Sequence, residues 1–228
     1  MNQDYFDTVG QNMIAGFLDY TPDDFELHIY AENITTDITV DYRIKYFDWN
    51  KACYNNWLSF SKKTKDTKSI KFAKKGFAFL HAMENTTAKY LIWVDADIEF
   101  LKKITNKIIN KTINNKLIGI FDHSYLGSTG YSAESGYVIL NTSHKYYKDF
   151  VNTYRYYFTL DGKPAEIEKW YDGQVCMLAA SKFKNDIFNL SLLAYNKDTH
   201  TPLNYCLLNE YMIHHKGPRA KRYIRNTT

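Results

Sequence analysis

Residues 90 to 100 read Tyr-Leu-Ile-Trp-Val-Asp-Ala-Asp-Ile-Glu-Phe, an apolar run that ends in two carboxylates, Asp95 and Asp97. Such a run after a helical pattern is typical of a central strand in a sheet covered on both faces. Open α/β sheets bind ligands at the carboxyl ends of their strands. In extended backbone, side chains at i and i+2 point to the same side, so both carboxylates are expected to converge on one cation. Oxygen anions at that spacing suit Mg²⁺ or Mn²⁺.

The length and composition predict one α/β domain over residues 1–228. The chain is long enough for one sizeable core, and its 24% charged and 45% hydrophobic residues are ordinary for a globular protein, which excludes extensive disorder. The three cysteines are widely separated and give neither a disulfide framework nor a zinc site. No signal peptide and no apolar run of about 18 residues is present, so we expect a cytoplasmic protein that binds no membrane.

The charge and the aromatic content leave the partner open. The net charge of +4 is too small to argue for nucleic acid by itself. Aromatic residues reach 17%, with 20 Tyr and 14 Phe, which either AT-rich coding or selection for stacking surfaces would produce.

The hydrophobic periodicity predicts helices that alternate with strands. Helices are expected over residues 4–20, 49–60, 70–85, 104–113, 146–160 and about 172–181, and strands over 25–31, 38–47, 117–121, 136–141, 187–195 and 211–213. Residues 61–69 are rich in lysine and residues 122–135 in glycine, serine and threonine, so both are expected to be loops.

Three segments, taken in order, carry a resemblance to a known family. They are IWVDAD at 92–97, ESGYVILN at 134–141 followed by WYDGQ at 170–174, and HHKGPRAK at 214–221. The chain resembles the glycosyltransferases of the GT-A fold, nucleotide-sugar-dependent enzymes with an Asp-x-Asp signature. More narrowly, it resembles the glycogenin and lipopolysaccharide galactosyltransferase group and the phage enzymes that glycosylate DNA. The resemblance implies a Rossmann-type three-layer fold with a mostly parallel central sheet, whose first strand is missing from this sequence.

The resemblance implies a divalent cation, Mn²⁺ or Mg²⁺, that bridges the two phosphates of the donor. Asp95 and Asp97 would bind it, with Asp97 favoured as the direct ligand, and the cation would act as a Lewis acid on the leaving diphosphate. Two alternatives are that Asp97 caps the next segment and that the pair is an exposed strand end.

The C-terminal segment is similar to the His-x-x-Gly-x-x-Lys element of the same group, in which the histidine completes the metal site and the other two residues hold the diphosphate. His214, Gly217 and Lys221 match it with one extra residue before the lysine, which leaves His215 as a rival ligand. A cluster of cations without an acid suits a pyrophosphate. A solvated basic tail and a nucleic-acid contact are the alternatives.

Further candidates come from the remaining segments. Glu134 is expected on a flexible loop, where it would bind sugar hydroxyls or serve as the general base of an inverting enzyme. Asp172 and Gln174 match an Asp-Gln pair at a helix start that contacts sugar or acceptor in retaining members, and a plain helix cap is the alternative for Asp172. Lys75 would either reach the donor phosphates or be a solvated lysine.

We therefore expect a metal-dependent glycosyltransferase that moves a sugar, most simply from a UDP-sugar, onto an acceptor hydroxyl. The basic tail and the aromatic residues favour a hydroxymethylated base in phage DNA, because a polyanion needs counter-charge and a flipped base needs stacking partners. The alternatives are a transferase of surface glycan or lipopolysaccharide synthesis and a non-catalytic nucleotide- or nucleic-acid-binding protein.

Overall fold

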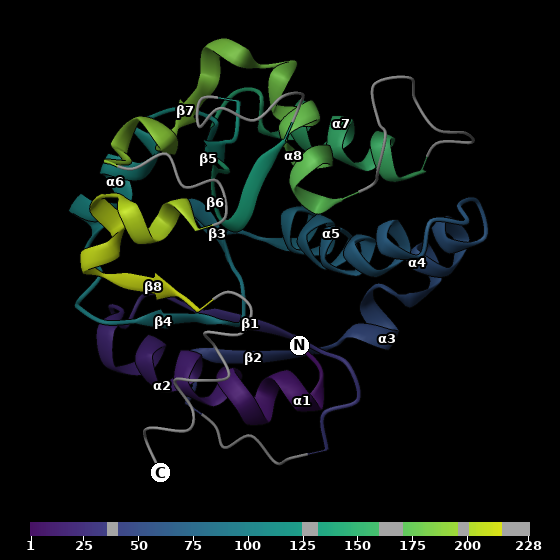
Figure 1. Ribbon diagram of the computed structural model, residues 1–228, viewed down its shortest axis with the longest axis horizontal. Coiled ribbons are helices and arrows are strands. Elements are labelled where there is room, and N and C mark those ends of the chain that lie inside the picture. The colour runs from purple at the N-terminus through teal and green to yellow at the C-terminus, as the bar shows by residue number, and fades with distance from the viewer. Residues whose placement is uncertain (36–40, 125–131, 160–170, 196–200, 216–228) are drawn as a thin grey trace.

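The computed structural model describes residues 1–35, 41–124, 132–159, 171–195 and 201–215. In these ranges helices cover a four-stranded sheet with the order β3-β6-β5-β7 (Figure 1). The strands are β3 (Tyr90–Val94), β5 (Ile118–Asp122), β6 (Ala133–Asn141) and β7 (Ile187–Asn189).

Three of these four strands share one direction. β5 pairs parallel with β7, and β6 pairs antiparallel with both β3 and β5. The expected parallel character therefore holds for β3, β5 and β7, and β6 is the exception. β6 starts at Ala133, so the glycine-rich and serine-rich stretch expected to be a loop as far as residue 135 already contributes the first residues of a strand.

Strand β3 is covered on both faces, but it is not central. It lies at one end of the sheet in the described part of the chain, and its residues are only partly buried. Leu91 and Trp93 pack against one hydrophobic cluster, whereas Tyr90, Ile92 and Val94 pack against the other. The apolar run of β3 thus arises because both faces of the strand are covered, and not because the strand has a neighbour on each edge. Hydrophobic periodicity does not distinguish a covered strand at the end of a sheet from one at its centre.

Two smaller ladders complete the described sheet structure. β1 (Leu27–Ala31) pairs parallel with β2 (Ile44–Asp48), and Asn2 forms a parallel bridge with Glu32 beside β1. β4 (Ile98–Phe100) pairs antiparallel with β8 (Met212–His214). The β4–β8 ladder therefore joins the segment directly after Asp97 to the last described residues.

The helices follow the predicted pattern closely. They are α1 (Gln3–Tyr5), a π-helical turn (Phe6–Gly10), α2 (Gln11–Tyr20), α3 (Trp49–Ala52), α4 (Tyr54–Ser61), α5 (Thr67–Asn85), α6 (Asn106–Ile113), α7 (Tyr147–Thr159) and α8 (Asp172–Ser181). None of the described helices is both long and apolar enough to cross a bilayer.

Local capping explains two boundaries that the sequence analysis misplaced. The Asp66 side chain accepts hydrogen bonds from the amides of Lys68 and Ser69, so α5 begins inside the lysine-rich stretch expected to be a loop. Asn189 accepts a hydrogen bond from the Ser191 amide, which ends β7 and starts a 3₁₀ turn (Leu190–Leu193) in place of the strand expected to run to residue 195. Of the strand expected over 38–47, residues 44–47 belong to β2, and residues 36–40 lie outside the described residues.

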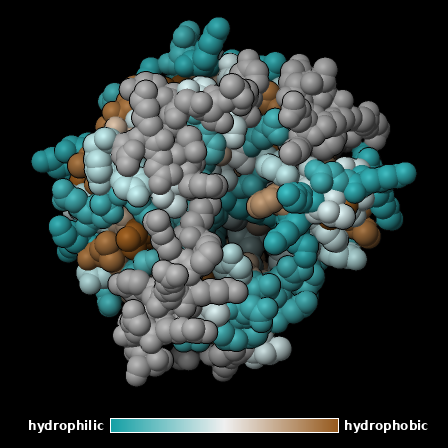
Figure 2. All heavy atoms as spheres, viewed as in Figure 1, coloured by the Kyte–Doolittle hydropathy of each residue, from teal (hydrophilic) through white to brown (hydrophobic). Residues whose placement is uncertain are grey.

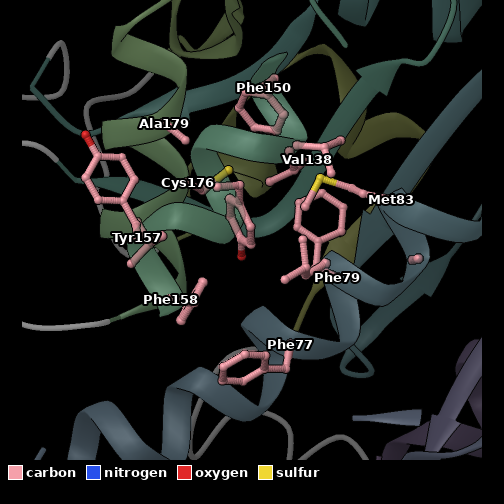
Figure 3. Close-up of a cluster of buried hydrophobic side chains, with 14 of the residues drawn as sticks. Phe77, Phe79, Met83, Val138, Phe150, Tyr157, Phe158, Cys176 and Ala179 are labelled. Carbon is pink, nitrogen blue, oxygen red and sulfur yellow. The ribbon is translucent and has the colours of Figure 1, made fainter. Parts of the chain in front are cut away.

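The two hydrophobic clusters meet at β6. Val138 and Leu140 belong to the cluster formed with α5, α7 and α8, and Tyr137 and Ile139 belong to the cluster formed with α2, β1 and β4. Figure 3 shows the first cluster, in which Phe79 and Met83 of α5 lie near Val138. Alternate side chains of β6 thus anchor both layers, which gives the residues at its start a rigid support.

Candidate functional site

The candidate site forms where β3 ends and β8 ends. After Val94 the chain turns, with the Ile98 amide donating a hydrogen bond to the Asp95 carbonyl at 3.1 Å, and then enters β4. β8 places His214 opposite Ile98, and the His215 amide donates to the Asp97 carbonyl at 2.9 Å. The C-terminal strand therefore places a histidine beside the two aspartates.

Asp95 and Asp97 converge on the imidazole of His214. Its Nε2 atom lies 3.1 Å from Asp97 Oδ1 and 3.9 Å from Asp95 Oδ2. The convergence was expected from extended backbone, but β3 ends at Val94 and residues 95–97 form a turn. The two carboxylates come together because the turn folds them toward β8.

His214 is buried in a way that suits a metal ligand. The residue is 2% exposed, and neither of its ring nitrogens has a hydrogen-bond partner among the described residues. Burying polar atoms without a hydrogen bond costs free energy, so native structures rarely contain them without a reason such as a bound ion. The ring has an electron pair to offer, and carboxylates surround it.

A second carboxylate reaches the same imidazole from the sheet. Ligand atoms of Asp95, Glu134 and His214 all lie within 4.8 Å of one another. Glu134 was expected on a flexible loop, but it lies in β6, is 5% exposed and accepts a hydrogen bond from the Gly136 amide at 2.9 Å. Two carboxylates and one imidazole form a donor set that fits Mn²⁺ or Mg²⁺. Asp97, the ligand favoured from the sequence, is outside this trio and contacts it at His214.

The two candidate histidines have different surroundings. The His215 ring extends to Glu99, with 2.7 Å between Nε2 and Oε2, whereas His214 faces the carboxylate cluster. Successive residues of a strand point to opposite sides, so only one of the two neighbours is brought to Asp95.

Lys75 links the trio to Asp172. Its Nζ atom lies 2.6 Å from Asp95 Oδ1 and 2.9 Å from Asp172 Oδ2, and it donates a hydrogen bond to the Ser135 carbonyl at 2.9 Å. Burial lowers the pKa of Lys75, but the charges of Asp172 and Asp95 raise it by more, and the net pKa lies above its usual value. The alternative of a solvated lysine is therefore wrong.

Asp172 is not a plain helix cap. It is the first residue of α8, the N-cap is Tyr171, and the cap makes no side-chain hydrogen bond. The carboxylate of Asp172, 7% exposed as a residue, instead accepts a hydrogen bond from the Ser135 hydroxyl and pairs with Lys75. Gln174 lies partly buried in the first turn of the same helix.

Several carboxylates gather at the site. Lys75 pairs with those of Asp95 and Asp172, and those of Asp97 and Glu134 lie beside His214. Buried carboxylates that lie close together repel one another and destabilise the fold unless a cation is nearby. Within the described residues the site is therefore suited to attract a cation.

Some residues of the site gave no signal in the sequence. Burial and then the charges of Asp97 and Asp95 raise the pKa of Tyr5, a half-exposed residue of α1. Ser135 contacts both Lys75 and Asp172. A tyrosine in an amphipathic helix and a serine in a polar stretch are too common to indicate a site.

Two other expectations cannot be placed. Gly217 and Lys221, expected to hold the diphosphate, lie outside the described residues.

The face shown in Figure 2 is hollowed near its middle, between α5 and β1 in this view and next to the region where β3 and β8 end.

Gly136 allows the imidazole to lie this close to β6. A Cβ atom on Gly136 would lie 2.5 Å from His214 Cε1 and 2.9 Å from its Nδ1. We expect Gly136→Ala to push the ring from the carboxylates and to weaken Mn²⁺ binding by about 10- to 100-fold, the usual cost of a misdirected ligand. Isothermal titration of the metal-free protein with Mn²⁺ measures this.

Gly173→Ala is the control for this variant. Its Cβ would meet the Ala133 carbonyl oxygen at 2.2 Å, so it moves β6 beside Glu134 without touching His214, and it should weaken Mn²⁺ binding less than Gly136→Ala does. Equal Mn²⁺ affinity for Gly136→Ala and the unmodified protein would contradict the position assigned to the imidazole.

Three solved structures of similar fold are named as glycosyltransferases. No protein-family model and no curated protein sequence matches the chain. The model matches mouse xyloside xylosyltransferase 1 in its apo form with a TM-score of 0.52 and 10% identity, over 82% of this chain and 80% of that one. It matches galactosyltransferase LgtC, in complex with donor and acceptor sugar analogs, with a TM-score of 0.56 and 11% identity, over 96% and 86%.

A third match has the same character. The apo structure of the WbbM bifunctional glycosyltransferase has a TM-score of 0.57 and 12% identity, over 99% of this chain but only 48% of that one. At these identities the similarity establishes the fold, and that fold is the GT-A fold expected from the sequence.

Proposed function

We propose that this protein is a metal-dependent glycosyltransferase that moves a sugar from a nucleotide sugar to an acceptor hydroxyl. The observation that carries the proposal is the buried His214 imidazole, which has no hydrogen-bond partner among the described residues and lies within 4.8 Å of the Asp95 and Glu134 carboxylates. This donor set lies at the carboxyl end of a strand, where α/β sheets bind ligands, in a fold that known glycosyltransferases share.

Asp95, Glu134 and His214 would hold the cation, and Asp97 would stand beside it. When bound, Mn²⁺ or Mg²⁺ would supply Lewis-acid stabilisation for the leaving diphosphate. A cation is required because the carboxylates of Asp95, Asp97 and Asp172 would otherwise repel a nucleoside diphosphate.

Lys75 and Ser135 orient Asp172 toward the same space. The Asp172 carboxylate pairs with the Lys75 ammonium and accepts a hydrogen bond from the Ser135 hydroxyl. An ionised carboxylate either accepts the proton of an acceptor hydroxyl or stabilises positive charge at the anomeric carbon. The anomeric configuration of the product distinguishes these two roles.

A saccharide acceptor is better supported than DNA. The preference for a hydroxymethylated base depended on a basic tail, whose residues 216–228 lie outside the described residues, and on an aromatic surplus. Many of the aromatic side chains are core residues, among them Phe77, Phe79, Phe150 and Phe158. They are therefore not available to stack on a flipped base. The LgtC structure holds an acceptor sugar analog, which favours a sugar hydroxyl.

The proposal is tested by sugar transfer with purified protein. We expect release of UDP from labelled UDP-sugars with Mn²⁺ or Mg²⁺ present, loss of release in EDTA and recovery when the metal is returned. Label should move to an oligosaccharide from a bacterial surface glycan rather than to hydroxymethylated duplex DNA. Transfer to the DNA alone would restore the alternative acceptor, and metal-independent UDP release would contradict the metal centre.

A further inference from the structure

Asn204 makes two hydrogen bonds to the backbone of His214. It belongs to a 3₁₀ turn (Pro202–Tyr205) that lies against β8. Its Oδ1 atom accepts a hydrogen bond from the His214 amide at 2.7 Å, and its Nδ2 atom donates one to the His214 carbonyl at 2.9 Å. An amide side chain bound in this way replaces one residue of a neighbouring strand, which would offer the same acceptor and donor.

The two edges of β8 are therefore held differently. On the side of β4, the His215 amide donates to the Asp97 carbonyl, and the Tyr211 carbonyl accepts from Leu101 at 2.7 Å. On the other side, Asn204 binds both polar backbone groups of His214. β8 is only three residues long, so each of these bonds is a large part of what holds it.

The ring of His214 needs this support because it has no hydrogen bond of its own. A metal-bound histidine usually donates its second ring nitrogen to a carboxylate or a carbonyl, which fixes the orientation of the ring. Neither ring nitrogen of His214 forms such a hydrogen bond within the residues the structure describes, although Nε2 lies 3.1 Å from Asp97 Oδ1. The orientation of the ring therefore depends on the backbone, on packing and on this contact with Asp97, and Asn204 supplies the backbone part.

We propose that Asn204 is a positioning residue that fixes the His214 imidazole toward Asp95 and Glu134. This inference rests on the proposed function, because it assigns Asn204 a role in the same metal centre. Asparagine suits the position because its side chain offers one acceptor and one donor, as a peptide group does. Alanine offers neither.

The test measures Mn²⁺ affinity by titration of the metal-free protein. Asn204→Ala should weaken binding by about 10- to 100-fold, the usual effect of removing a group that orients a ligand. Asn209→Ala is the matched control, because the Asn209 amide, five residues along the chain, donates to the Tyr195 hydroxyl and not to β8, and it should bind Mn²⁺ as the unmodified protein does. Asn204→Ser keeps at most one of the two hydrogen bonds, so it should lose less Mn²⁺ affinity. It replaces the alanine variant in the test if that variant fails to fold.

A double-mutant comparison separates positioning from general destabilisation. If Asn204 acts through His214, adding Asn204→Ala to His214→Ala should weaken Mn²⁺ binding no further. If Asn204→Ala lowers Mn²⁺ affinity equally in the unmodified protein and in His214→Ala, the proposal is contradicted and Asn204 has only a structural role. Unchanged affinity for His214→Ala would contradict the metal centre itself, whereas a weakened His214→Ala beside an unaffected Asn204→Ala would overturn only the role of Asn204.

Discussion

Glu134→Gln is expected to lower the rate of metal-dependent sugar transfer by about 10²- to 10³-fold, the usual cost of losing one charged group that stabilises a transition state. Glutamine has nearly the same shape and keeps an oxygen for the Gly136 amide, so the local structure should persist. The lost charge should also weaken Mn²⁺ binding, because Glu134 is one of the two carboxylates beside His214.

The same variant distinguishes two roles for Glu134. If it binds the metal, Mn²⁺ affinity and transfer fall together. If it is instead the general base considered from the sequence, transfer falls and Mn²⁺ affinity is unchanged, which would remove Glu134 from the metal centre. Glu210→Gln, at a largely exposed site, is the control and should change neither quantity.

The metal-free form of Glu134→Gln should be at least as stable as the unmodified protein. The substitution removes the charge of one of the two carboxylates that lie together beside His214, and relief of their mutual repulsion offsets the loss of a charged hydrogen bond. Thermal unfolding in EDTA measures this. A large drop in the unfolding temperature would show that the charge of Glu134 serves the fold.

Lys75→Met is expected to destabilise the fold by about 3–5 kcal/mol, because it leaves Asp95 and Asp172 without their shared cation. For a domain of this size such a loss lowers the unfolding temperature by roughly 10 °C. Adding Asp172→Asn to this variant should restore part of the stability, since it removes one of the two orphaned charges. Lys71→Met, at an exposed position one turn earlier on α5, should have little effect.

The effect of Lys75→Met should not change with pH near neutrality. The ion pairs raise the pKa of Lys75 above its usual value of about 10.4, despite the opposing effect of burial. Its contribution to stability is therefore fully present below that value and is lost only as the pH rises through the folded-state pKa. The difference in unfolding temperature between the variant and the unmodified protein should be constant from about pH 6 to pH 9, and a difference that disappears within that range would contradict the pairing.

Some of the fold follows from local pattern. The helices over α2, α5 and α6 show regular apolar spacing, so their existence was predictable, whereas the cap at Asp66 that starts α5 earlier was not predicted. The position of β3 in the sheet was not predictable in the same way. A strand covered by helices on both faces has the same apolar run at the end of a sheet as at its centre.

The sequence by itself determined that Asp95 and Asp97 follow a buried-type strand, because apolar runs are local properties. The resemblance to the GT-A glycosyltransferases implied that His214 or His215 belongs with them. Only the tertiary structure decided which residues share the site. The register of β4 against β8 brings His214 rather than His215 to the carboxylates, and β6 carries Glu134 to the same imidazole. Lys75 became a buried partner of Asp95 and Asp172, which are distant along the chain. These contacts depend on how strands and helices pack, and no short stretch of sequence encodes that packing.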